Sequence, residues 1–372
     1  MDRPSPRLIV VLGLFSTFGP ISLDLYLPAL PDLADDLGTS TSAAQLSITA
    51  CLIGLAAGQL VAGPLSDRFG RKRPLVVGLA AYLLASAACA FAPSIELLLA
   101  LRLVQGLAGA AGVVIARAVA RDLFTGRALV VFFARLMLVS GMAPIVAPLL
   151  GGQLAKVMDW RGMFGVLAAF GLVLLLAGAL GLSETLPRER RVAGGVPETV
   201  RGFGSLLKDR RFAGVTATTG LASASMFAYI AGATFVLQRT YGMSAQGFSF
   251  VFGANSIGIV VMGQVGARLV HRTSPLRLMA IGVGLNLLGS TGVAVTVLTG
   301  LGRPFLIASL WVMVSALGLV FPNASAIALS EHGDRAGSAS AVSACPSTSS
   351  EHWPRRSSGW PEGPVRCRWG SS

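Results

Sequence analysis

Apolar runs of about twenty residues, separated by short polar connections, repeat along most of the chain. A helix needs about 20 apolar residues to cross the hydrocarbon core of a bilayer, so this pattern predicts transmembrane helices. The connections are short except for one basic, Gly- and Pro-rich stretch near residues 183–211. The ten runs cover approximately residues 8–30, 43–65, 74–93, 97–117, 129–152, 160–182, 212–236, 246–269, 276–299 and 304–329.

The long basic stretch divides the predicted helices into two groups. We expect an N-terminal six-helix bundle over residues 1–182, a cytoplasmic linker over 183–211 and a four-helix bundle over 212–332. Residues 333–372 are polar and contain no run of spanning length, so they predict a disordered tail. The change of character is abrupt around residues 343–346, and a truncation or frameshift is our interpretation of it.

Composition supports a membrane protein and excludes several other classes. Of 372 residues, 53% are hydrophobic and 13% are charged, whereas soluble domains carry about 25% charged residues. The net charge of +13 lies in short loops without interleaved aromatic residues, so we expect no nucleic-acid partner. The three His residues fall outside the apolar runs and the chain has no Cys-x-x-Cys pair. We therefore expect no enzyme, no metal site and no cofactor.

The placement of basic residues predicts the orientation of the chain. With the N-terminus in the cytoplasm, the inward-facing loops contain 20 Lys and Arg residues and the outward-facing loops contain four. Such an excess is expected from the positive-inside rule. The first outward loop instead carries three acidic residues, which are Asp32, Asp35 and Asp36.

The densest charge lies in GPLSDRFGRKRP, residues 63–74, between the second and third runs. Its two Gly residues allow a tight connection between antiparallel helices. Its Asp can bind a helix N-terminus or pair with an Arg. A positive-inside anchor explains the charge but not the order of residue types. The residues of this loop motif are Gly63, Asp67, Arg68, Gly70, Arg71 and Lys72.

That order resembles the signature loop of the major facilitator superfamily. LALRLVQGLAGAAG (99–112) is similar to the fourth-helix motif of that family, and SGMAPIVAPLLGG (140–152) to its fifth-helix antiporter motif. LDLYLPALP (23–31) and ARAVARDLF (116–124) narrow the resemblance to the Bcr/CflA group of bacterial drug:proton antiporters. The resemblance covers roughly residues 8–340. The fifth-helix motif comprises Gly141, Pro144, Pro148, Gly151 and Gly152.

The resemblance implies an all-α transporter with twelve helices in two bundles. It implies alternating access, export of drugs in exchange for protons, and a place in the bacterial inner membrane. We expect a monomer whose partners are a small-molecule substrate and the lipid bilayer, with the proton gradient in place of a cofactor. Helices eleven and twelve are missing from the ten predicted runs. Asp67 is therefore expected to lose the partner that helix eleven provides in the family.

Asp24 is the carboxylate that we place well inside a predicted span. A charge at the centre of a helix costs about 2.5–3.5 kcal/mol, so its presence indicates a function. Arg102 lies in the fourth run, which crosses the bilayer in the opposite direction, and we estimate that it lies at a similar depth. We hypothesise that Asp24 carries the proton and that Arg102 tunes it; the alternative is a fixed ion pair that locks two helices. Ser16, Pro20 and Pro28 share the Asp24 face at i+4 spacing and predict a kinkable helix.

Other polar residues in the spans are weaker candidates. Tyr26, Gln105 and Tyr229 are candidates for the substrate cavity. Asn255, Asn286 and Asn323 are expected to form interhelical hydrogen bonds. Two other functions remain open from the residues: an exporter of a metabolite such as an amino acid, dipeptide or sugar, and a non-functional remnant of an antiporter.

Overall fold

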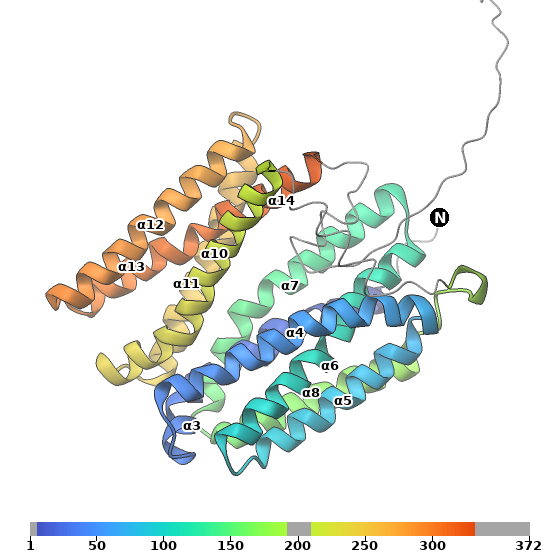
Figure 1. The fold of residues 1–372 in the computed structure, drawn as a ribbon, viewed down its shortest axis with the longest axis horizontal. Coiled ribbons are helices and arrows are strands. Elements are labelled where there is room, and N and C mark those ends of the chain that lie inside the picture. The colour runs from blue at the N-terminus through green and yellow to red at the C-terminus, as the bar shows by residue number, and fades with distance from the viewer. Residues whose placement is uncertain (1–5, 192–209, 332–372) are drawn as a thin grey trace, which may run out of the picture.

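The computed structural model describes residues 6–191 and 210–331 of the chain. We call these segments the N-terminal half and the C-terminal half; their regular structure is helical and contains no strand. Figure 1 shows the helices of the two halves lying side by side. The predicted disordered tail over residues 333–372 lies outside the described residues.

Long helices make up both halves. Those of the N-terminal half are α1 (Pro6–Ser16), α2 (Phe18–Asp24), α3 (Leu30–Asp36), α4 (Thr41–Phe69), α5 (Lys72–Ala90), α6 (Ile95–Leu123), α7 (Gly126–Leu154) and α8 (Trp160–Gly181), with the 3-10 helices η1 (Leu27–Ala29) and η2 (Arg188–Arg190). Those of the C-terminal half are α10 (Arg210–Phe235), α11 (Ala245–Leu269), α12 (Pro275–Thr299), α13 (Arg303–Ser315) and α14 (Leu317–Glu331). A π-helical turn, η3 (Val236–Thr240), extends α10.

The described helices confirm an all-α polytopic membrane protein. Eight helices are long and apolar enough to cross a bilayer, and the bent stretch from α1 to α3 makes a ninth. The shorter apolar segment Val139–Leu154 of α7 corresponds to the remaining predicted run. Among these spans, α13 and α14 together form one crossing over Arg303–Ile327.

The first span is broken where its prolines remove backbone donors. Pro20 cannot donate to the carbonyl of Ser16, and the chain bends by 46° between the segments Leu8–Ser16 and Phe18–Asp36. Pro28 likewise cannot donate to the carbonyl of Asp24, and α2 ends at that residue. The predicted kink is confirmed, and it places Asp24 at the end of a helix segment.

Small residues hold α4 against α6. A Cβ atom added to Gly54 would lie 2.1 Å from the Leu103 carbonyl oxygen, and one added to Gly106 would lie 2.0 Å from that of Cys51. Only Gly permits such a close approach of two helix backbones. This packing fixes the position of Arg102, which lies one turn before Gly106 on α6.

The connection between α4 and α5 is shorter than the sequence predicts. Helix α4 continues through Asp67 to Phe69, and Gly63 is buried inside it. The expectation that Gly63 forms part of the turn is therefore wrong. The chain reverses at Gly70, whose φ of +89° favours glycine.

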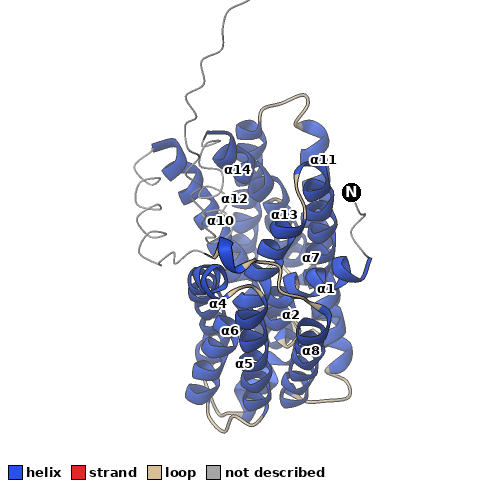
Figure 2. Ribbon diagram, turned by 90° about the vertical axis from the view of Figure 1, so that its right-hand side faces the viewer, coloured by secondary structure: helices blue, strands red, loops and turns tan. Residues whose placement is uncertain are grey.

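The two halves contact each other at one end of their helices. Residues 28–45 and 144–152 of the N-terminal half hydrogen-bond to residues 231–256 of the C-terminal half. We call this region the contact end. In Figure 2, where the helices are seen from the side, α7 lies at the boundary between the two groups.

Candidate functional site

Arg102 is buried in the middle of the N-terminal half. Its side chain has no exposed surface, and its Nη1 atom donates to the Ser22 carbonyl oxygen at 3.0 Å and to Gln105 Oε1 at 2.5 Å. Its Nε atom donates to the Ser47 carbonyl oxygen at 3.3 Å. The guanidinium also lies 4.6 Å from the centre of the Tyr26 ring. These contacts join α2, α4 and α6 through a single cation.

A chain of hydroxyl groups surrounds the guanidinium. Gln105 Nε2 donates to Ser86 Oγ at 2.7 Å. The hydroxyls of Tyr26 and Ser47 lie 2.8 Å apart and share a hydrogen bond, and Ser22 forms a similar bond with Tyr82 on α5. The sequence did not identify these serines as site residues, because Ser is common in apolar membrane-spanning segments. Tyr26 and Gln105 thus belong to the surroundings of Arg102.

Asp24, which the sequence places at a depth similar to that of Arg102, makes no contact with it. Its residue is 5% exposed, and its carboxylate has no hydrogen-bond or ion-pair partner in the part of the chain that the structure describes. The fixed ion pair with Arg102, our alternative reading, is wrong. Ser22 faces α5 and α6, and Asp24 is two residues further along, which turns it by about 200° on a helix. The carboxylate therefore points away from the guanidinium.

Tyr229 is a buried residue of α10 in the C-terminal half. Its hydroxyl oxygen accepts a hydrogen bond from Asn255 Nδ2 at 2.8 Å. The Tyr229 ring stacks on Phe252, with ring centres 5.3 Å apart. This interhelical bond of Asn255 is as expected, and so is that of Asn286, which donates to the Met313 carbonyl at 2.8 Å. Asn323 is different, because it donates to Leu319 in its own helix.

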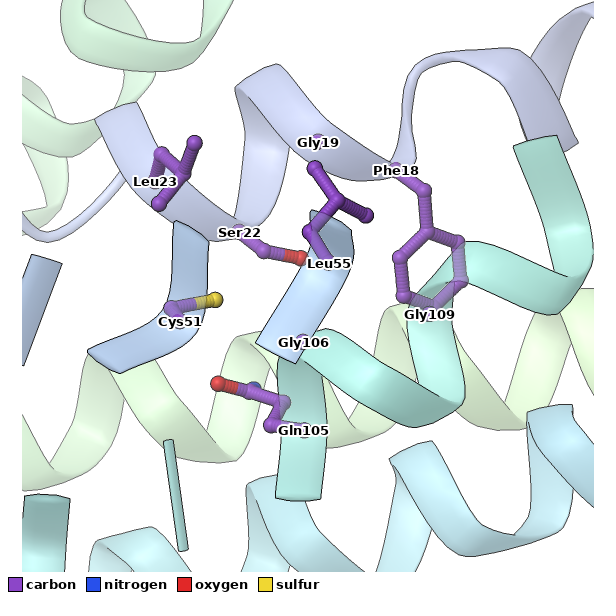
Figure 3. A pocket seen from close by; sticks show the side chains of 9 residues that line it. All are labelled: Phe18, Gly19, Ser22, Leu23, Cys51, Leu55, Gln105, Gly106 and Gly109. Carbon is purple, nitrogen blue, oxygen red and sulfur yellow. The ribbon is translucent and has the colours of Figure 1, made fainter. Parts of the chain in front are cut away.

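Two hollows can be compared in size. The enclosed cavity in Figure 3 lies between α2, α4 and α6, beside Ser22, Cys51 and Gln105, and its volume of about 10 Å³ suits one water molecule. An open groove between α11 and α13, lined in part by Asn255 and Trp311, has a volume of about 720 Å³. A drug-sized molecule fits the groove but not the enclosed cavity.

The α7 motif forms much of the contact end. Pro148 has no N–H for the Pro144 carbonyl, and that oxygen accepts a hydrogen bond from Ser256 Oγ of α11 at 3.1 Å. A Cβ atom on Gly151 would lie 2.0 Å from the Leu25 carbonyl oxygen, and one on Gly152 would lie 2.3 Å from a side-chain oxygen of α11. The motif therefore brings α7 close to both the broken first span and the C-terminal half. Gly141 differs, because a Cβ atom there meets nothing within 4 Å.

Glutamine and arginine side chains complete the contact end. Gln45 donates to the Ala231 carbonyl at 3.1 Å, and Gln238 donates to the Pro28 carbonyl at 3.0 Å. Arg239 donates to the Pro31 carbonyl at 3.1 Å and pairs with Asp35. The acceptors on the first span, Pro28 and Pro31, lie in the segment that follows its break. Sequence reasoning missed these glutamines, since the carbonyls they reach lie about 190–210 residues away along the chain.

The loop motif forms an ion cluster at the opposite end of the helices. Arg71 donates to Asp67 at 2.5 Å, to Ser66 Oγ at 2.8 Å and to Asp122 of α6 at 2.8 Å. Asp67 thus has a partner within its own half, Arg71. The expectation that it lacks a partner on helix eleven concerns residues outside the described structure and stays a prediction. Arg68 is exposed and stacks on Phe69, with 5.2 Å between its guanidinium and the ring centre.

Glu184, just after α8, was not predicted from the sequence. Its carboxylate accepts from the amides of Arg71 at 2.8 Å and Lys72 at 3.3 Å, at the N-terminus of α5. Partial burial would raise the pKa of this carboxyl, but three backbone N–H groups and the charge of Arg191 hold the pKa below its ordinary value. The charged carboxylate therefore ties the end of α8 to the start of α5 at neutral pH.

The helical bundles, the broken first span and the buried carboxylate define a polytopic membrane transport protein. The chain belongs to the Major Facilitator Superfamily, whose sequence profile matches residues 10–345. Members of this family are transporters and not enzymes.

Relatives and solved structures agree with this assignment. The chain is 41% identical to the uncharacterized MFS-type transporter YdgK of Bacillus subtilis, over 90% of this chain and 84% of that protein. It is 29% identical to the bicyclomycin resistance protein homolog of Haemophilus influenzae, over the same shares of the two chains. The crystal structure of the nucleoside transporter NupG superposes with a TM-score of 0.71 at 15% identity, over 90% of this chain and 86% of that one. This last likeness shows the fold.

Proposed function

We propose that the chain is a Bcr/CflA-type antiporter that exports amphipathic or cationic drugs in exchange for protons. The similarity to a bicyclomycin resistance protein homolog supports drug export. The observation that carries the proton exchange is Asp24, a buried carboxylate without a partner in the described structure, at the break of the first span. Such a group can hold either a proton or the positive charge of a drug, because both satisfy the same buried anion.

The proposal assigns roles to the remaining motifs. Arg102 holds the broken first span against α4 and α6, so that Asp24 keeps its position while it exchanges its ligand. Tyr229, buried in the C-terminal half, forms part of the substrate cavity. The loop motif and the α7 motif act in the rocking of the halves. The first holds the N-terminal half rigid through Arg71, and the second supplies a contact surface that can separate.

The orientation follows from the positive-inside rule. We place the N-terminus and the 183–211 linker in the cytoplasm of a bacterial cell, with the chain in its inner membrane as a monomer. The contact end then faces outward. A structure whose halves meet at that end is an inward-facing state of an alternating-access cycle.

Two other functions remain as candidates. A metabolite exporter would use the same buried carboxylate for an amino group, and a substrate screen separates it from a drug exporter. The second candidate is a non-functional remnant of an antiporter. It applies if transport requires the two C-terminal spans, helices eleven and twelve of the family, that correspond to α7 and α8 of the N-terminal half. Helix α8 packs along α5, whereas α12, which follows α11 as α5 follows α4, exposes Leu287, Leu288 and Leu298.

The test is proton exchange in vesicles. Inside-out vesicles containing the chain are energised with a pH gradient, and tetraphenylphosphonium is added as a cationic amphiphile. We expect the cation to dissipate the gradient with the wild type and not with Asp24→Asn. The matched control is Asp36→Asn, a carboxylate that lies half exposed in an ion pair with Arg161. Equal activity of the wild type and Asp24→Asn would falsify the role of Asp24.

A further inference from the structure

Helices α5 and α8 present a continuous apolar surface to the bilayer. They pack along each other and lie side by side in Figures 1 and 2. On α5, Val77 and Leu84 each have 68% of their surface exposed, and their spacing of seven residues places them on one face. On α8, Leu180 is 84% exposed. Both helices are long and apolar enough to cross a membrane, so these side chains contact lipid acyl chains.

Three arginines lie where this apolar surface ends, at the start of α5 and just after α8. Arg73 is four residues before Val77 and therefore lies on the same face of α5. Arg188 and Arg190 belong to the 3-10 turn η2, which follows α8. All three residues are exposed, and none of their side chains has a hydrogen-bond or ion-pair partner within the described residues.

Glu184 holds the start of α5 and the segment after α8 together. Its carboxylate accepts from the amides of Arg71 at 2.8 Å and Lys72 at 3.3 Å, directly before Arg73. Arg191, the residue after η2, lies 3.8 Å from the same carboxylate. The two groups of exposed arginines thus belong to one corner of the N-terminal half, which we call the basic corner.

The acidic residues of the basic corner offset only part of its charge. Asp67 and Asp122 are paired with Arg71, and Glu184 is engaged as described above. Glu189 of η2 is exposed and remains to balance the arginines. Three exposed arginines therefore face one exposed carboxylate. An excess of positive charge beside an aliphatic surface is complementary to a lipid that has a negative headgroup and apolar chains.

We propose that the basic corner binds a phospholipid with an anionic headgroup. The phosphate lies against Arg73, Arg188 and Arg190, because guanidinium groups donate paired hydrogen bonds to phosphate oxygens. The acyl chains follow the exposed faces of α5 and α8. In the orientation proposed above, the lipid belongs to the inner leaflet, and it ties the start of the 183–211 linker to the membrane. The inference does not depend on the role of Asp24.

The test is lipid binding to the purified full chain in detergent, measured by native mass spectrometry. Dioleoylphosphatidylglycerol is titrated, and dioleoylphosphatidylcholine, with the same chains and a neutral headgroup, is the comparison. The variants are Arg73→Gln and the double variant Arg188→Gln with Arg190→Gln, and circular dichroism checks that they keep the wild-type helicity. The matched control is Arg272→Gln with Arg277→Gln. It removes two exposed arginines near the connection of α11 to α12, which corresponds to that of α4 to α5.

Each arginine near a lipid headgroup contributes about fivefold to binding, so we expect the wild type to prefer phosphatidylglycerol by about a hundredfold. The double variant at Arg188 and Arg190 should lose about thirtyfold and Arg73→Gln about fivefold. The control at Arg272 and Arg277 should bind as the wild type does.

Three results would overturn the inference. Equal binding of the two lipids by the wild type means that the headgroup charge is not recognised. Equal losses in the two double variants mean that the net charge of the chain attracts the lipid and that no site exists. Complete displacement of the lipid by excess inorganic phosphate would assign the basic corner to a free ion, because a lipid held also by its acyl chains stays bound.

Discussion

Adding one methyl group to α7 should open the contact end. The Cβ atom of Gly152→Ala would lie 2.3 Å from Ser249 Oγ. The hydroxyl can rotate aside, but the Cβ atom of Ser249 would lie at 2.7 Å. Ordinary contact begins at 3.4 Å, so α11 has to retreat by about 0.7 Å, the difference between these two distances. The retreat strains two bonds between the halves, Gln246 to the Gly152 carbonyl at 3.0 Å and Ser256 to the Pro144 carbonyl at 3.1 Å.

The expected shift follows from these contacts. Interhelical hydrogen bonds in membranes are worth about 0.6 kcal/mol each, and overpacking costs about 1–3 kcal/mol. In Gly152→Ala, the conformation with a closed contact end is therefore destabilised by about 2 kcal/mol or more. The open conformation is not destabilised, because α7 and α11 are apart there. A difference of 2 kcal/mol changes the ratio of closed to open molecules by about thirtyfold.

Spin-label distances measure this ratio. Labels at Val157→Cys, just after α7, and Leu298→Cys, near the end of α12, occupy exposed positions of the two halves. They are introduced after the four native Cys residues are replaced by Ala. The wild type should give one distance population, and Gly152→Ala should add a longer one. Gly141→Ala is the matched control, because it adds the same methyl to the same helix and meets nothing within 4 Å. The reasoning is refuted if Gly152→Ala keeps the wild-type distances, or if Gly141→Ala changes them equally.

Two further predictions concern the stability of the N-terminal half. Glu184→Gln should increase hydrogen exchange of the Arg71 amide roughly tenfold, since a charged acceptor is lost. In the wild type the lowered pKa of Glu184 means that this protection is complete above about pH 4.3 and is lost as the pH falls through the lower folded value; loss of protection already near pH 6 would contradict it. Gly106→Ala should destabilise the chain by about 2 kcal/mol in thermal unfolding, because its methyl meets the Cys51 carbonyl at 2.0 Å. Gly165→Ala is the control and should leave the stability unchanged, because its methyl meets nothing within 4 Å. Equal destabilisation by the two substitutions would contradict the packing argument.

The spans and their breaks could be predicted from the sequence because they depend on local properties. Hydrophobicity over about twenty residues determines which segments enter a bilayer, and each proline removes a hydrogen bond at a known place. Pro20 and Pro28 thus predicted the bent first span that the structure shows.

The partners of the polar groups were decided by tertiary structure. Depth estimates placed Asp24 and Arg102 in one layer, but depth says nothing about rotation around the helix axis. The guanidinium bonds to carbonyls that the broken first span and α4 present to it, and no ion pair joins it to Asp24 among the described residues. Glu184 reaches the start of α5 from more than 110 residues away along the chain. Sequence patterns specify which face of a helix is polar, whereas the packing of all the helices decides what that face meets.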